Sequence, residues 1–106
     1  MVRALIRVPP FVRAGEVFEV RVLLQHPMES GFRPGPDGQV LPRDIVTRVE
    51  ARLDGQPVFA ADLFPAIAAN PYLAFPLRVA ASGTLELALR GDKALAQVER
   101  VAITVA

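Results

Sequence analysis

Apolar and polar residues alternate along most of this chain, and this period of two constrains the fold more than any other feature. Within residues 84–90, every second residue is a leucine. Residues 16–25 repeat the pattern, with an apolar residue at every even position from 18 to 24. An α-helix would place Arg21 beside Val17 and Val20, whereas an extended chain puts Arg21 and Val20 on opposite faces. Both segments are therefore predicted to be β-strands with one buried face.

Five further segments have the composition of strands and are bounded by turn residues. They are residues 2–8, 44–53, 58–61, 72–79 and 97–105. Pro76 interrupts one of them, and because proline cannot donate to a sheet ladder, it predicts an edge strand or a bulge there.

The segment at residues 44–53 fits two interpretations. Its apolar residues at 45, 49 and 53 have helical spacing, and Asp44 could cap a helix. The same three residues also share one face of a strand. Asp54-Gly55 follows at once, and an Asp-Gly pair between apolar segments is typical of a tight β-hairpin. We therefore predict a strand.

Two longer connections join the predicted strands. Residues 64–71 are expected to hold a short helical turn between their prolines. Residues 30–42 are rich in glycine and proline, and form either a long loop or a hairpin closed by Asp37-Gly38. About seven short strands with turns every 8–12 residues or so predict an immunoglobulin-like sandwich of two antiparallel β-sheets. We expect one domain that covers residues 1–106.

The composition excludes several classes of function. The 106 residues include no cysteine, which rules out disulfides, thiolate metal sites and thiol catalysis. The net charge is +1 and the arginines are dispersed, whereas nucleic-acid-binding proteins cluster their basic residues. No apolar run reaches the roughly 20 residues that span a bilayer. Arg3 and Arg7 interrupt the N-terminal apolar segment. We therefore expect no nucleic acid, no membrane and no signal peptide of the chain's own.

His26 is the only histidine, and it stands close to Met28 where an apolar strand ends. A His-x-Met pair could contribute to a copper site, so a metal-binding or accessory β-sandwich domain with its site at His26 and Met28 is one interpretation. One histidine and one methionine do not complete a ligand set, however, and no nucleophile–base pair or cofactor motif accompanies them. In the structural interpretation, His26 caps the strand end by hydrogen bonding and Pro27 directs the loop. Met28 then fills the core or offers a flexible contact.

Three segments carry a family resemblance. Residues 24–31 are Leu-Gln-His-Pro-Met-Glu-Ser-Gly, residues 54–58 are Asp-Gly-Gln-Pro-Val, and residues 69–75 are Ala-Asn-Pro-Tyr-Leu-Ala-Phe. In order and spacing they resemble SoxZ, the small subunit of the SoxYZ carrier in bacterial thiosulfate oxidation, over nearly the whole chain. The Pro- and Gly-rich insert between Arg33 and Pro42 departs from the family pattern.

The resemblance implies a non-catalytic subunit that pairs with SoxY, a protein that holds the sulfur substrate on a cysteine in a mobile C-terminal arm. The paired carrier would then make transient contacts with the other Sox enzymes. The resemblance also implies a periplasmic location, reached by co-export with the signal-bearing partner. We expect no cofactor. The candidate partner-contact residues are His26, Met28, Glu29, Asn70 and Tyr72.

Overall fold

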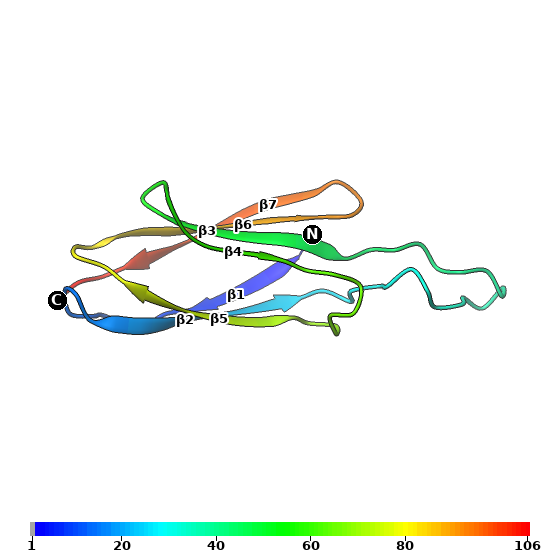
Figure 1. The fold of residues 1–106 in the computed structure, drawn as a ribbon, viewed down its shortest axis with the longest axis horizontal. Coiled ribbons are helices and arrows are strands. Elements are labelled where there is room, and N and C mark those ends of the chain that lie inside the picture. The colour runs from blue at the N-terminus through cyan, green and yellow to red at the C-terminus, as the bar shows by residue number, and fades with distance from the viewer. Residues whose placement is uncertain (1) are drawn as a thin grey trace.

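The computed structural model describes residues 2–106, and its regular structure is entirely β. Seven strands form two antiparallel sheets that face each other, in the orders β1-β2-β5 and β4-β3-β6-β7 (Figure 1). The strands are β1 Arg3–Arg7, β2 Val17–Gln25, β3 Val46–Leu53, β4 Gln56–Asp62, β5 Tyr72–Arg78, β6 Gly83–Gly91 and β7 Leu95–Ile103. The predicted immunoglobulin-like β-sandwich is confirmed.

The core lies between the sheets and follows the alternation of the sequence. In β2 the apolar residues at even positions from 18 to 24 are buried, and in β6 the leucines at 85, 87 and 89 are buried. The ring of Phe75 in β5 stacks on that of Phe59 in β4, with centroids 4.4 Å apart. This contact joins the two sheets at one flank, where both strands lie at a sheet edge. Pro76 in β5 therefore occupies an edge strand, as predicted.

The β3–β4 hairpin turns at Asp54 and Gly55, which have φ angles of 48° and 85°. Positive φ at both central residues is the conformation of a type I′ turn, the tight turn that matches the twist of paired strands. Asp54 also accepts a hydrogen bond from the Thr84 N–H group at 2.9 Å, which ties the turn to β6. The strand interpretation of residues 44–53 is confirmed, although the strand begins only at Val46.

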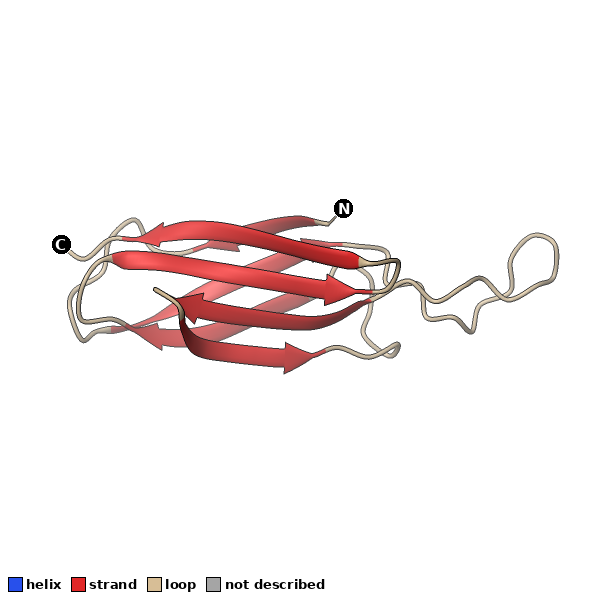
Figure 2. Ribbon diagram, turned by 90° about the horizontal axis from the view of Figure 1, so that it is seen from above, coloured by secondary structure: helices blue, strands red, loops and turns tan. Residues whose placement is uncertain are grey.

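Residues 30–43, which we call the arm, project from one end of the sandwich (Figures 1 and 2). The two limbs of the arm run antiparallel, with Pro34 opposite Val40 and backbone hydrogen bonds on both sides of this pair. Asp37 and Gly38 lie in the turn at its tip. The arm is therefore an irregular hairpin, the second of the two predicted alternatives. It contributes to the elongated shape of the molecule, which measures 57 × 20 × 18 Å.

Residues 64–71 connect β4 to β5 and contain one hydrogen-bonded turn. In this turn the Ile67 N–H group donates to the Phe64 carbonyl at 3.0 Å. The expected helical turn is thus a single turn that does not extend into a helix. Within residues 2–106, no helix is long and apolar enough to cross a membrane.

Candidate functional site

His26 fixes the point where the chain leaves β2. Its backbone N–H group donates to Asn70 Oδ1 at 3.1 Å, and the Asn70 N–H group donates back to the His26 carbonyl at 2.8 Å. The imidazole Nδ1 accepts a hydrogen bond from the Met28 N–H group at 2.9 Å. The ring is buried, with 7% of the residue exposed. His26 is therefore a capping residue that joins the end of β2 to the segment before β5.

Met28 belongs to the hydrophobic core. Only 5% of the residue is exposed, and its sulfur accepts a hydrogen bond from the Val46 N–H group at 3.3 Å. Beyond the end of β2, the alternation continues through buried His26 and exposed Pro27 to buried Met28, which has a φ angle of 50°. Of the two roles that the sequence left open, the core role fits this placement. The side chain offers no surface to a partner unless the junction opens.

The contacts of His26 and Met28 also bear on the metal-site interpretation. Because Nδ1 of His26 accepts the Met28 N–H group, a neutral ring carries its proton on Nε2. The sulfur of Met28 is turned toward the Val46 N–H group inside the core. A metal ion would have to replace both hydrogen bonds and open the core, so the geometry does not favour a site at these two residues.

Glu29 and Asp44 close the base of the arm. Each donates its backbone N–H group to the carbonyl of the other, and both distances are 2.8 Å. The Glu29 carboxylate also forms an ion pair with Arg33, and the hydrogen bond from this guanidinium lowers the pKa of Glu29. The His26-Pro27-Met28-Glu29 motif therefore builds a rigid base, from which the arm projects in a defined direction.

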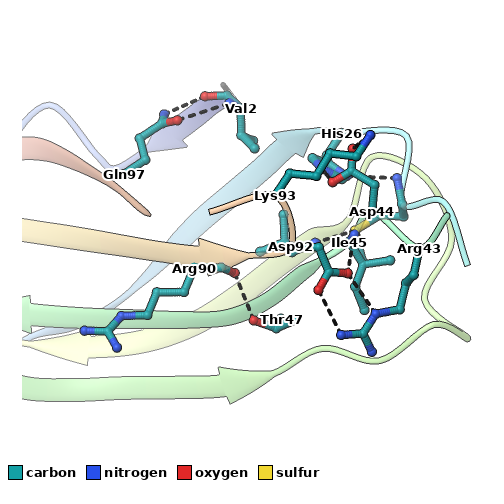
Figure 3. A network of polar contacts seen from close by, with 12 residues as sticks. Val2, His26, Arg43, Asp44, Ile45, Thr47, Arg90, Asp92, Lys93 and Gln97 are labelled. Carbon is teal, nitrogen blue, oxygen red and sulfur yellow. Dashed lines mark hydrogen bonds and ion pairs between the residues drawn. The ribbon is translucent and has the colours of Figure 1, made fainter. Parts of the chain in front are cut away.

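Asp92 braces the same end of the sandwich from the turn between β6 and β7 (Figure 3). Its carboxylate accepts a hydrogen bond from Arg43 Nη2 at 2.8 Å and another from the Ile45 N–H group at 3.2 Å, and Oδ2 forms an ion pair with Arg43 Nε at 2.8 Å. The hydrogen bond from Arg43 is the main reason why the pKa of Asp92 lies below its ordinary value. Arg43 is the last residue of the arm, so this contact anchors the arm to the sandwich.

An Asp92→Asn variant is expected to be less stable than the wild type at neutral pH by roughly 1 kcal/mol, since it loses a charged hydrogen-bond acceptor. The pKa of Asp92 is lower in the folded than in the unfolded chain, so its stabilisation is complete above the unfolded value of about 3.8. This stabilisation is lost as pH falls through the lowered folded value. Melting curves of both proteins between pH 2 and pH 7 should therefore converge at the acid end. A constant difference at every pH would contradict this role of the Asp92 charge.

A cleft of about 390 Å³ lies in front of this network, lined by His26, Asp44, Asp92, Lys93 and the start of β7. The carboxylate of Asp44 lies between two side chains: Oδ1 is 3.6 Å from His26 Nε2, and Oδ2 is 3.5 Å from Lys93 Nζ. Within residues 2–106, no buried side-chain nitrogen or oxygen lacks a hydrogen-bond partner. The polar groups of the cleft are thus engaged with one another, and the arrangement holds the junction together.

Tyr72 lies on the outer face of the three-stranded sheet. The register places Leu5, Leu23 and Tyr72 side by side across β1, β2 and β5. Tyr72 is 59% exposed, and a hollow of about 210 Å³ is lined by this row together with Arg7 and Arg21. Leu5 and Leu23 are half-buried, and such a partly exposed apolar row with arginines beside it is typical of a protein-binding surface.

The structure brings the five candidate contact residues to one end of the sandwich. His26 and Met28 have buried side chains that shape this end, while Asn70 and Tyr72 are exposed and Glu29 is half-buried. Whether a partner touches any of the five stays a prediction.

Sequence reasoning missed two groups of residues at this end. The turn sequence Gly91-Asp92 was a local signal for a bend, but nothing local showed that Asp92 would meet Arg43, 49 residues away. The exposed apolar side chains of the arm, chiefly Phe32 and Val40, were also missed. An isolated phenylalanine in a Gly- and Pro-rich loop was the available signal for the arm.

The family model described as "Sulphur oxidation protein SoxZ" matches residues 6–102. The chain belongs to the SoxZ family. The predicted resemblance is confirmed, and the matched region includes the whole His26–Gly31 motif and both exposed candidates, Asn70 and Tyr72. Membership of this family indicates that the chain has a role in sulfur oxidation. None of the curated proteins matches this sequence.

Solved structures with the same fold include the superoxide reductase (neelaredoxin) from Ignicoccus hospitalis. Its TM-score is 0.75 at 22% sequence identity, and the alignment covers 97% of this chain and 80% of that chain. Two variants of the same reductase give a TM-score of 0.76 at 22% identity, covering 97% of this chain and 79% of theirs. At this identity the likeness shows the fold alone.

Proposed function

We propose that this SoxZ-family chain is the non-catalytic subunit of a two-subunit sulfur carrier. It pairs with a cysteine-bearing SoxY-type subunit and presents that subunit to the enzymes of thiosulfate oxidation. The family membership supports this role, and so does the composition. A chain with no cysteine cannot bind the substrate covalently through a cysteine sulfur, so the partner must hold it.

The exposed apolar side chains of the arm are the structural observation that supports this pairing. Phe32 is 79% exposed and Val40 is 59% exposed, and Pro34 and Pro42 are exposed beside them. An isolated two-stranded hairpin is marginally stable in water, and this one covers none of these side chains. A partner that buries them would supply the missing stabilisation.

The charges and prolines of the arm favour an apolar contact. Arg33 is paired with Glu29 and Arg43 with Asp92, so the charged groups of the arm's base are satisfied within the chain. The prolines of the arm restrict its backbone, which reduces the conformational entropy that the arm loses on binding. The arm is thus suited to a stable subunit contact with an apolar groove.

Co-expression with the candidate SoxY-type subunit tests the proposal. Size-exclusion chromatography with mass measurement should give one species that contains both chains in equal amounts. Each subunit purified alone is the control for self-association. Separate elution of the two chains at micromolar concentration would contradict the pairing.

We also propose that the chain acts in the periplasm and arrives there bound to its partner. The support is the family membership. Deleting the export signal of the partner should therefore retain both chains in the cytoplasm, as fractionation and immunoblotting would show. Arrival of this chain in the periplasm without the partner would count against co-export.

A further inference from the structure

The outer faces of the two sheets differ in how their charges are arranged. On the four-stranded sheet, basic and acidic residues lie opposite each other on neighbouring strands. Arg48 pairs with Asp62 at 2.7 Å, and Arg100 pairs with Glu86 at 3.2 Å. The register places both pairs directly across the strands. Arg90 lies opposite Arg48 on this sheet, but Arg48 is also paired with Glu50 at 2.7 Å, so carboxylates are interspersed among the arginines of this face.

The outer face of the three-stranded sheet carries charges that the chain does not neutralise. Arg7 in β1 lies directly opposite Arg21 in β2, and like charges at opposite positions of an antiparallel pair repel each other. Glu19 pairs with Arg21 at 2.7 Å. Among residues 2–106, no carboxylate lies within 4.0 Å of the Arg7 guanidinium. The exposed residues Arg3 and Arg78 add further positive charge to this face.

These arginines border apolar surface. The hollow of about 210 Å³ between Arg7, Arg21 and the Leu5–Leu23–Tyr72 row has room for one apolar side chain, since an apolar cavity of about 150 Å³ admits benzene. A second hollow of about 300 Å³ also borders Arg7 and Arg21. Tyrosine and arginine around a central pocket are the residue types that contribute most to binding at protein interfaces.

This surface is continuous with the base of the arm. Tyr72 follows Asn70 by two residues, and Asn70 is hydrogen-bonded to His26, where the chain turns toward the arm. One partner can therefore cover both the apolar row and the arm.

We propose that the cysteine-bearing partner subunit docks on the outer face of the β1-β2-β5 sheet through an apolar side chain and a nearby carboxylate. The apolar side chain enters the hollow beside Tyr72. The carboxylate lies between Arg7 and Arg21 and removes their repulsion. This inference rests on the proposed function and specifies the surface that the partner uses and the chemistry that the partner must present.

The test compares two charge reversals that change the net charge equally. Arg7→Glu alters the proposed surface, and Arg90→Glu alters an exposed arginine on the four-stranded sheet. Calorimetric titration with the partner subunit should show about a tenfold or greater loss of affinity for Arg7→Glu in 50 mM salt, a smaller loss in 500 mM salt, and no loss for Arg90→Glu. Tyr72→Ala should weaken binding at both salt concentrations, because its contribution is apolar.

If the wild-type chain binds the partner, and Arg7→Glu and Tyr72→Ala bind it with the same affinity, this docking surface is overturned. The proposed function then still stands. An equal loss for Arg90→Glu would overturn this docking surface as well, since the effect would then be one of net charge. A wild-type chain that does not bind the partner at all would overturn the proposed function and this inference with it.

Discussion

Met28→Glu is expected to unfold the chain or to lower its melting temperature steeply. The side chain lies in the core, so the variant buries a carboxylate where an apolar side chain was packed. A buried charge without a partner costs at least about 3 kcal/mol. For a domain of this size, that loss corresponds to a fall of roughly 12 °C or more in melting temperature.

The matched control for this experiment is Met28→Leu. It keeps the volume and the apolar character of the side chain, and should cost less than about 1.5 kcal/mol. Circular dichroism melting curves of both variants, recorded without any partner, separate the two outcomes. If Met28→Glu melts like the wild type, the side chain does not lie in the core, and the contact role becomes the better interpretation.

The double substitution Phe32→Ser with Val40→Ser is expected to leave the isolated chain stable and to weaken its pairing. Both side chains are exposed, so the melting temperature should change little. Burial of one large apolar side chain contributes about 1.5–3 kcal/mol, so the loss of two should lower the affinity for the SoxY-type subunit by roughly a hundredfold or more.

Gln39→Ser is the matched control for the arm, because it changes an exposed polar residue near the same tip. Titration of the partner subunit into each protein gives the three affinities. Equal affinity for the wild type and the double variant would show that the arm does not contribute to pairing.

The strands and the core could be predicted from the sequence because they depend on local order. The leucines of β6 and the even-numbered residues of β2 are buried as their alternation indicates. The Asp54-Gly55 turn fixed the choice between helix and strand for residues 44–53, since its two positive φ angles suit few other residue pairs. In these cases backbone preference and burial pattern agree, so local reasoning was sufficient.

The candidate site depends on contacts between distant residues, which local reasoning does not supply. The His26–Asn70 hydrogen bonds join residues 44 positions apart, and the Arg43–Asp92 pair joins residues 49 apart. The burial of Met28, by contrast, continues a local pattern, since the even-numbered residues are buried from Phe18 through Met28.

The residues at the arm end of the sandwich have different roles in this account. His26, Met28 and Asp92 set the geometry of the junction and are satisfied within the chain. The exposed residues of the arm and of the three-stranded sheet remain available to a second protein. Substitutions in the first group should reduce the stability of the isolated chain, and substitutions in the second should reduce the affinity for its partner.

The central claim is that this chain binds the protein that carries the sulfur and does not carry the sulfur itself. Intact-mass measurement of both subunits, after the co-purified complex has been loaded from thiosulfate by its cognate enzymes, tests this claim most directly. We expect the mass of the SoxY-type subunit to increase by a sulfur adduct, while the mass of this chain stays that of its unmodified sequence. A stable sulfur adduct on this chain, or an adduct-bearing partner that never co-purifies with it, would contradict the account.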